Sequence, residues 1–198
     1  IRWNFRHKNI VKIKEKKKNE KRWAWVLTGS GHFFSESIEL INKLKNIDLF
    51  VSKAAEEVLK MYKKKGDLSE KIKVYRDTTA SSVPVGQFYK GIYHTLIMAP
   101  TSSNTVAKCV VGISDNLATN VFAQSGKCRV FCIFFPCDTA PELKTMSPKG
   151  MVDVYPRSID LENVNKLKKF ERIEVAMSFT ELKKQIKKRE KWLKESFF

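Results

Sequence analysis

The sequence predicts a single α/β domain in which a mostly parallel, doubly wound sheet has helices on both faces, giving three layers. Three observations support this prediction. Short apolar runs of strand length alternate with longer segments of helical periodicity. Glycine, serine and threonine gather directly after several apolar runs, where strand-to-helix loops belong. The 198 residues suit one domain with a substantial core, and the sequence has no internal repeat.

The first third of the chain predicts two strands that are each followed by a helix. Residues 23–27 form a short apolar run, broken by the Thr-Gly-Ser-Gly loop at 28–31, and residues through Lys45 then have helical periodicity. Residues 47–51 form the second apolar run, and we expect a helix over 53–64. These segments make a βαβ unit, whose crossover should be right-handed.

The middle of the chain repeats this pattern less regularly. We expect a small strand at 72–75, and the small residues at 78–86 predict a mobile loop. Residues 93–98 form the next predicted strand, a polar loop covers 99–105, and a helix over 106–112 follows. Another polar loop therefore joins a strand to a helix.

The last third completes the predicted sheet. Residues 130–135 are fully apolar, as expected of a strand that is buried on both faces. Residues 151–155 are a possible edge strand, residues 160–170 look helical, and residues 173–177 form another possible strand. An amphipathic helix from residue 179 closes the chain. This alternation is typical of a flavodoxin/Rossmann-like domain.

The net charge of +17 is concentrated at the two ends of the chain. Residues 1–22 hold ten Lys or Arg and two Glu, and residues 165–198 hold eleven and five. Because a nucleic-acid site needs basic residues beside stacking and phosphate-contacting elements, we expect no nucleic acid. An RNA-binding module that grips with its basic ends stays open as an alternative. We predict a basic extension at 1–20 and the domain at 21–198.

Hydropathy and cysteine spacing predict a cytoplasmic protein without a metal. No uncharged run approaches the length of a membrane span, and the basic start lacks the features of a secretory signal. Cys109, Cys128, Cys132 and Cys137 match neither zinc nor ferredoxin spacing, so reduced thiols are expected. A shared metal remains an alternative, since Cys128 and Cys132 lie four apart in a strand-like run.

Three loops fall at the predicted carboxyl ends of strands, where open α/β sheets collect their ligands. The loop at 28–31 has two glycines that permit close backbone approach and two hydroxyls that could donate to a phosphate. Ser52 is an N-cap candidate. The loop at 99–105 supplies four hydroxyls and one amide, which could cap a helix or bind a polar ligand.

At this third loop the chain resembles a known family. APTSSNTVAK at 99–108, followed by VGISDNLAT at 111–119, is similar to the Pro-x-x-x-Asn-Thr, Gly-Ile-x-Asp-x-Leu pattern of FMN-binding homo-oligomeric flavoproteins, which include cysteine decarboxylases. The TGSGH form at 28–32, the TTASS loop at 78–82 and the basic closing helix look most like the archaeal flavoprotein branch, which includes proteins similar to dihydromethanopterin reductase. Members of that branch are associated with ferredoxin-linked electron transfer.

The resemblance implies an FMN site and a subunit contact. It implies a trimer, or a larger assembly of trimers, with the flavin where subunits meet. His32 and the loop at 78–86 become candidates for the face over the isoalloxazine ring, with His32 as the candidate catalytic residue. The implied cofactor contacts are Thr28, Gly29, Ser30, Gly31, Ser52 and Lys53 near the ribityl phosphate, then Ala99, Pro100, Thr101, Ser102, Asn104 and Thr105, and then Asp115, Asn116 and Leu117.

The departures from the family pattern favour electron transfer. Decarboxylase members carry a Pro-x-Met-Asn-x-x-Met-Trp clasp where this chain has PCDTAPEL at 136–143, and flavin prenyltransferases use a different polar loop. Ferredoxin-type cysteines are absent, so an iron–sulfur cluster would sit on a partner. We therefore expect an FMN oxidoreductase that accepts electrons from ferredoxin or a similar acidic redox protein. The alternative is a reductase of a pterin or similar small molecule, ahead of a decarboxylase or an RNA-binding module.

Overall fold

The computed structural model describes residues 21–62, 67–78, 82–147 and 149–196. Its main sheet has six strands in the order β3-β2-β1-β4-β5-β8, and every neighbouring pair is parallel. The predicted three-layer doubly wound sheet is therefore confirmed. The strands are β1 (Arg22–Leu27), β2 (Ile47–Val51), β3 (Lys73–Arg76), β4 (Tyr93–Thr101), β5 (Phe131–Pro136) and β8 (Ile173–Val175). The predicted extension at 1–20 lies outside the described residues.

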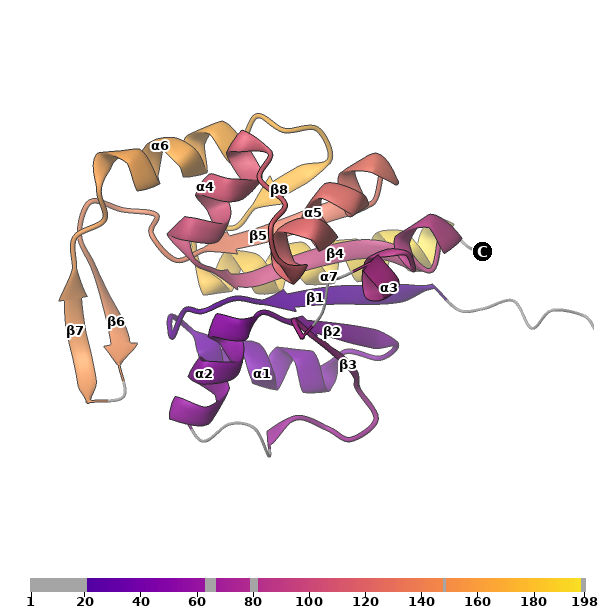
Figure 1. Cartoon of the computed structure of the whole chain (residues 1–198), viewed down its shortest axis with the longest axis horizontal. Helices are drawn as coiled ribbons and strands as arrows, with labels where there is room; N and C mark the ends of the chain where they lie inside the picture. Colours follow the sequence, from indigo (N-terminus) through magenta and orange to yellow (C-terminus); the bar gives the residue numbers. More distant parts are fainter. Residues whose placement is uncertain (1–20, 63–66, 79–81, 148, 197–198) are drawn as a thin grey trace, which may run out of the picture.

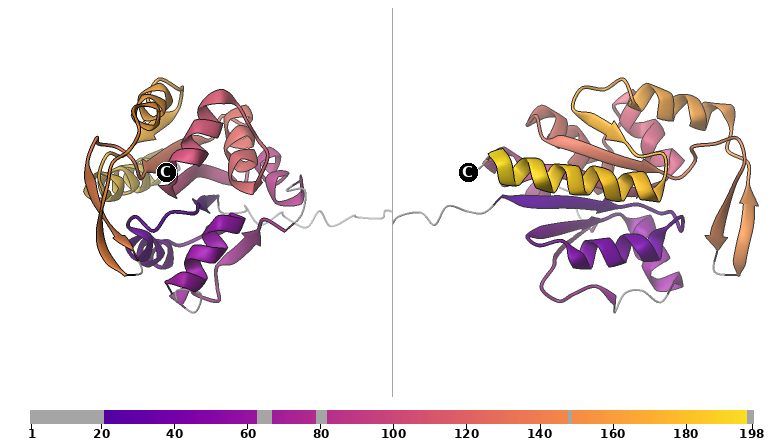
Figure 2. Two further views of the ribbon diagram at one scale, coloured as in Figure 1. Left: turned by 60° about the vertical axis from the view of Figure 1, so that its left-hand side comes forward. Right: turned by 180° about the vertical axis from the view of Figure 1, so that it is seen from behind.

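The helices divide between the two faces of the sheet (Figures 1 and 2). One core cluster joins the sheet to α1 (Phe34–Lys43), α2 (Lys53–Met61) and α7 (Phe179–Ser196). The opposite cluster joins it to α3 (Ser82–Val85), the short turn η2 (Phe88–Lys90), α4 (Ser103–Val111), α5 (Leu117–Lys127) and α6 (Ser158–Leu167). Alternate residues of β1 enter the two clusters, because successive strand side chains point to opposite faces.

The strand order reverses beside β1, and this places the loops that matter for function. The chain winds outward from β1 through β2 to β3, and then crosses to β4 on the other side of β1. The loops that follow β1 and β4 therefore leave the sheet in opposite directions. A crevice opens between such loops at the carboxyl ends of the strands, which is where this class of sheet binds ligands.

Several predicted boundaries were wrong. The fourth strand runs on to Thr101 and α4 begins at Ser103, because the hydroxyl of Ser102 caps the helix and makes the predicted polar loop very short. Part of the loop predicted at 78–86 is the single turn α3, and residues 79–81 lie outside the described residues. Cys128 ends α5 and is not in a strand with Cys132, so the two thiols do not share one strand face.

Two features were not predicted as they occur. Helix α5 lies in a segment for which no helix was predicted. The strand expected at 151–155 exists as β7 (Gly150–Val154), but it pairs with β6 (Leu143–Ser147) in an antiparallel hairpin separate from the main sheet. Figure 1 shows this hairpin at the end of the molecule opposite the C-terminus.

Candidate functional site

A cavity of about 370 Å³ lies at the carboxyl edge of the sheet, beside the reversal between β1 and β4. Its volume is within the range of small-molecule sites. A second hollow of about 280 Å³ adjoins it and shares His32 in its lining. The main cavity is lined by the β1 loop, the start of α4, the end of β5 and the hairpin, with Gly29, Ser30, Gly31, His32, Ser102, Ser103, Cys137, Asp138, Thr145 and Met146 among the contributors.

Thr28 joins the two loops that flank the reversal. Its Oγ1 donates a hydrogen bond to the carbonyl of Pro100 (2.9 Å) and accepts one from the backbone N–H of Ser102 (2.8 Å). The side chain is buried, so both bonds are made away from water. The single hydroxyl proton of Thr28 is thus committed to the protein, and this residue positions the site.

Unlike Thr28, Ser30 accepts two hydrogen bonds within the protein and donates none. Its Oγ lies 3.2 Å from the backbone N–H of His32 and 2.8 Å from Sγ of Cys137, and both groups donate to it. Burial raises the pKa of the Cys137 thiol to about 12, so this sulfur keeps its proton. Because a hydroxyl has two lone pairs and one proton, the proton of Ser30 remains to be donated, and Ser30 lines the cavity.

The two glycines of this loop permit close contact with α2. A Cβ atom at Gly29 would overlap the Cβ of Ala54, and one at Gly31 would overlap the hydroxyl of Tyr62. A side chain at Gly29 would push the loop away from the helix, whereas one at Gly31 would displace the tip of the Tyr62 side chain. The glycines thus permit close approach to α2, and the predicted close approach to a phosphate stays a prediction.

At this edge of the sheet, helices α2, α4 and α5 each begin with a capping side chain. Ser52 accepts from the N–H of Ala55 (3.1 Å) at the start of α2, and Ser102 accepts from Thr105 at α4. Asn116 accepts from Thr119 (3.1 Å) at α5. The first N–H groups of a helix have no partner within it and form the positive end of its dipole. Ser102 and Ser103 at the start of α4 line the cavity, and the start of a helix favours an anion.

The other predicted contacts are not part of the cavity lining. Ala99, Pro100 and Thr101 are buried in β4, and the Ala99 carbonyl accepts a hydrogen bond from the Trp25 indole (2.6 Å). Leu117 is buried and donates its N–H to Asp77 (3.2 Å), at the end of β3. The remaining members are Ser52, Lys53, Asn104, Thr105, Asp115 and Asn116.

Asp115 forms an exposed ion pair. Its carboxylate lies 2.6 Å from the ammonium of Lys108, one turn before the end of α4. The hydrogen bond from that ammonium lowers the pKa of Asp115. Asp115 therefore fastens the α4–α5 turn in this structure.

His32 connects the β1 loop to the hairpin. Its Nδ1 lies 2.9 Å from the hydroxyl of Thr145, and its ring packs against Phe33 and Phe135. Burial lowers the pKa of His32, and the nearby Asp138 and Glu36 oppose that shift. The hydroxyl of Tyr62 also donates to the carbonyl of Met146 (2.8 Å). A neutral imidazole thus stands at the cavity wall, within a contact that holds the hairpin over the site.

Sequence reasoning missed the hairpin and the residues after β5 as parts of this site. Cys137 and Asp138 directly follow a strand that was predicted, so the same rule that selected the other loops could have found them. The sequence Ser-Pro-Lys-Gly at 147–150 is rich in residues that favour turns, which is a recognisable hairpin signal. In the described part of the chain, no group of three metal-ligating side chains occurs and no helix is long and apolar enough to span a membrane.

Comparison with known proteins places the chain beside flavoproteins. Residues 11–190 match the family described as Flavoprotein. The structure of DmrB from Burkholderia xenovorans in complex with FMN, described as a cubic protein cage for redox transfer, superposes with a TM-score of 0.82 at 47% identity and covers 89% of this chain and 99% of that one. These matches confirm the family resemblance that the motifs at 99–119 predicted.

Two curated relatives come from methanogenic archaea. The uncharacterized protein MJ0730 of Methanocaldococcus jannaschii is 35% identical over 174 residues, which are 83% of this chain and 94% of that protein. Dihydromethanopterin reductase (acceptor) of Methanosarcina mazei is 38% identical over 131 residues, which are 59% of this chain and 55% of the reductase. The aligned region thus spans about half the length of that reductase.

Proposed function

Because the chain belongs to the Flavoprotein family, we propose that it binds FMN at the carboxyl edge between β1 and β4 and reduces a pterin-type substrate with it. The family match and the FMN complex of DmrB support the cofactor, and the reductase relative supports the substrate class. In this proposal ferredoxin, the electron donor expected from the sequence, reduces the flavin. The reduced flavin then reduces the pterin, which is the electron acceptor.

The observation that carries the cofactor proposal is the spare proton of Ser30 beside the start of α4. Ser30 can donate to an oxygen of the ribityl phosphate, and the N–H groups of Ser103 and Asn104 lie in the first turn of α4, where helices bind anions. The proposed cofactor contacts also include Gly29, Gly31, Ser52, Lys53, Ala99, Pro100, Thr101, Ser102, Thr105, Asp115, Asn116 and Leu117, with Thr28 holding the two loops together.

The chemistry divides between the cofactor and the protein. Bound FMN supplies reversible hydride and electron transfer. The protein binds, orients and excludes water: Thr28 sets the spacing of the two loops, and the hairpin covers the cavity through the contacts of His32 and Tyr62. Neutral His32 can exchange one hydrogen bond with a substrate at the cavity wall. Reduction of a dihydropterin consumes two electrons and two protons.

The first experiment tests the cofactor. The purified protein is expected to be yellow or to become so on reconstitution with FMN, with flavin fluorescence quenched on binding. Ser30→Ala should weaken FMN binding about 10- to 100-fold, as expected for one hydrogen bond to a charged group. Ser158→Ala, an exposed position at the start of α6, is the matched control and should leave the affinity unchanged. A colourless protein that cannot be reconstituted contradicts the proposal.

The second experiment tests the substrate. FMN-loaded protein, reduced chemically under anaerobic conditions, should reoxidise when a dihydropterin is added and should form the tetrahydropterin in equal amount. The reaction is followed by the return of flavin absorbance and by chromatography of the pterin. Flavin that stays reduced with every dihydropterin tried, while still exchanging electrons with ferredoxin, contradicts the pterin assignment and returns the protein to simple electron transfer.

We propose a ferredoxin-type acidic protein as the donor because of the charge on α7. This helix exposes a set of lysines on its outer side, and summed positive potential speeds encounter with an acidic partner. The set consists of Lys183, Lys184, Lys187, Lys188, Lys191 and Lys194. Reduced ferredoxin should bleach the flavin at a rate that falls as salt is raised.

A paired variant locates this contact. Lys184→Gln with Lys187→Gln should slow bleaching by ferredoxin several-fold at low salt and have little effect at high salt. Lys60→Gln with Lys71→Gln removes the same charge from exposed positions elsewhere and serves as the control. Equal slowing by both pairs would mean that net charge alone guides the encounter and that α7 is not the docking surface.

The chain is also proposed to assemble with copies of itself, as a trimer or a multiple of trimers. DmrB is described as a cubic cage. In this chain the hairpin exposes apolar side chains, with Met146 at 52%, Met151 at 58% and nearby Tyr155 at 69% exposure. Light scattering after size-exclusion chromatography should give an oligomer, and Met151→Glu should shift it towards smaller species. A monomer at micromolar concentration contradicts this proposal.

A further inference from the structure

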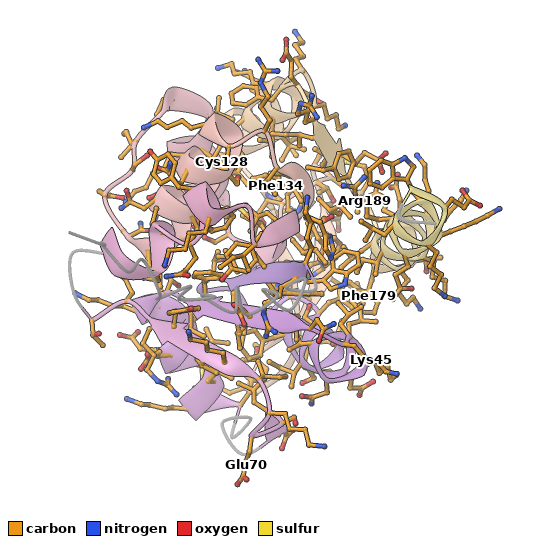
Figure 3. All side chains as sticks on the ribbon, turned by 90° about the vertical axis from the view of Figure 1, so that its right-hand side faces the viewer. Lys45, Glu70, Cys128, Phe134, Phe179 and Arg189 are labelled. Atoms are coloured by element: carbon orange, nitrogen blue, oxygen red, sulfur yellow. The ribbon has the colours of Figure 1, made fainter. Side chains whose placement is uncertain are left out.

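A third cavity, of about 380 Å³, lies at the amino edge of the sheet, away from the site described above. It opens where α5 ends and β5 begins, beside the turn that joins α6 to β8. Figure 3 faces this edge and labels Cys128 at the end of α5. The lining combines two arginines, Arg129 and Arg172, with two aromatic rings, Phe122 and Phe170.

Both arginines have a positive φ, a backbone conformation that other turns into this sheet give to glycine or asparagine. Four turns that enter strands of the main sheet contain a residue with positive φ: Asn46 before β2, Gly91 before β4, Arg129 before β5 and Arg172 before β8. Glycine and asparagine are the residues that adopt this left-handed conformation most readily. The turns into β2 and β4 follow that preference. The turns into β5 and β8 carry arginine instead, so backbone geometry does not account for the residue type.

The fold brings these two turns together. Strands β5 and β8 are parallel neighbours in register from Cys132 and Ile173, and the N–H of Cys132 donates to the carbonyl of Arg172 (2.9 Å). Both strands therefore start at the same end of the sheet, and both arginines line one cavity. Among the described residues neither arginine is ion-paired with a carboxylate, although Glu171 lines the same cavity.

The two aromatic rings of the lining differ, since Phe122 packs against the core and Phe170 is partly exposed. The ring of Phe122 lies edge-on against Phe134 in the core, with centroids 5.2 Å apart. Phe170 lies 6.4 Å from Phe122 with its plane tilted by 26°, and it is 37% exposed. The cavity thus combines an apolar wall with two exposed arginines in its lining. Guanidinium groups bind carboxylates and phosphates through paired hydrogen bonds and also stack on flat rings.

We propose that this cavity is a binding site for a small organic anion, namely a phosphate or carboxylate carried on a planar ring. Arg129 and Arg172 bind the anionic group, and Phe122 and Phe170 contact the ring. The site is separate from the flavin proposal, since it uses the opposite edge of the sheet and other residues. It would hold a ligand whether or not FMN binds at the carboxyl edge.

Calorimetric titration tests the proposal with adenosine monophosphate as probe. FMN-saturated full-length protein is used, so that the carboxyl-edge cavity cannot take the probe; protein that fails to bind FMN is titrated as purified, which keeps the two proposals distinguishable. Binding in the millimolar range or tighter is expected. Adenosine, which lacks the phosphate, and inorganic phosphate, which lacks the ring, should each bind at least 10-fold more weakly.

Variants assign the binding to the cavity. Arg129→Asn with Arg172→Asn should weaken binding of adenosine monophosphate at least 10-fold, and asparagine suits both left-handed positions, so the fold should persist. Phe170→Ala should weaken it about 3-fold. Lys127→Gln with Lys169→Gln removes two exposed charges from the same end of the molecule without altering the lining and should have no effect. Absence of binding by the wild-type protein, or equal weakening by the arginine and lysine pairs, overturns the proposal.

Discussion

At the amino edge of the sheet the buried carboxylate of Asp48 accepts hydrogen bonds from Arg22 (2.6 and 2.9 Å) and from the hydroxyl of Tyr93 (2.7 Å). At the carboxyl edge the hydroxyl of Ser30 has both lone pairs occupied and a proton that no described residue accepts. The Asp48 network at the amino edge thus satisfies its buried polar groups within the chain, whereas the Ser30 hydroxyl at the carboxyl edge keeps a proton for a ligand.

This difference predicts that substitutions at the two edges separate stability from binding. Groups that pair within the protein contribute to the free energy of unfolding, and their loss leaves buried partners without hydrogen bonds. Groups that await a ligand contribute little to unfolding of the free protein and more to affinity. Each prediction below tests one edge against the other, using the free energy of unfolding and the FMN dissociation constant.

The largest effect is expected for Asp48→Ala. It leaves the Tyr93 hydroxyl buried without its acceptor and Arg22 without its counter-charge, and breaking a buried pair of this kind costs several kcal/mol. Since Arg22 is 31% exposed, we expect a loss of about 3 kcal/mol in the free energy of unfolding, measured by urea denaturation. FMN affinity of the folded fraction should not change.

The control for Asp48 is Asp153→Ala in the hairpin. Asp153 pairs with Lys144 at 3.7 Å, and both side chains are well exposed. An exposed pair contributes at most about 1 kcal/mol, so this variant should unfold nearly as the wild type does. Similar losses for the two variants would mean that the amino-edge network adds nothing beyond an ordinary surface charge pair.

The second effect is a pH dependence that arises at the amino edge. Burial, with Arg189 nearby, lowers the pKa of His94 from its usual 6.5 to about 3. Below pH 6.5 the unfolded chain binds a proton that the folded chain does not, so stability falls as pH falls through this window. One such proton changes the free energy of unfolding by about 1.4 kcal/mol per pH unit, or about 2 kcal/mol between pH 6 and pH 4.5.

Replacing each histidine in turn shows which one causes the pH dependence of the unfolding free energy. His94→Gln should flatten the slope of unfolding free energy between pH 6 and pH 4.5. His32→Gln should keep much of that slope, because His94 remains. The window lies above the pKa values of Asp115 and Asp160, both of which are lowered by hydrogen bonds from their basic partners, so those carboxylates do not interfere. A slope unchanged by His94→Gln would refute the assignment.

The third effect comes from the close approach of the β1 loop to α2. Gly29→Ala introduces a Cβ that overlaps the Cβ of Ala54, and overpacking of this kind costs about 1–3 kcal/mol. We expect a loss of about 1.5 kcal/mol in stability and weaker FMN binding, since the displaced loop carries Ser30. Ala54→Gly in the same chain removes the overlap.

The double variant tests whether the overlap of the two Cβ atoms causes these losses. If the overlap is the cause, Gly29→Ala with Ala54→Gly should restore FMN affinity close to that of Ala54→Gly alone, and the coupling between the two sites should appear in a double-mutant cycle. Additive losses in both quantities would show that Gly29 is needed for another reason, such as direct contact with the ligand.

Much of the fold was predictable because its strands are local features of the sequence. The run at 130–135 is apolar throughout, so a buried strand was the simple interpretation, and the strand occupies 131–136. Helix α5 was not predicted, although its start carries a sequence signal, since Asn116 and Thr119 form a capping box.

Of the predicted loops, those after β1 and β4 contribute to the cavity lining, and their positions follow from the strand assignments and from the rule for ligands in open sheets. The predicted loop after β2, with Ser52 and Lys53, is not part of that lining. The contacts that define the chemistry join residues distant in sequence. Ser30 meets Cys137 across 107 residues, and His32 meets Thr145 across 113. Only folding decides such pairs, so no local pattern could reveal which hydroxyl keeps a free proton.

The smallest effect is expected where a ligand-facing group is held by a neighbour. Cys137→Ala removes the thiol that donates to Ser30, which frees the hydroxyl to turn and weakens its donation into the cavity. FMN should bind about 3-fold more weakly, equal to about 0.7 kcal/mol. Cys132→Ala is the matched control, since this thiol is equally buried but contacts Ser125, away from that cavity. Both variants should lose similar stability, because each deletes one buried sulfur, and Cys137→Ala alone should lose affinity. Equal loss of FMN affinity in Cys132→Ala would contradict the separation of stability from binding, because core packing would then control affinity at the carboxyl edge as well.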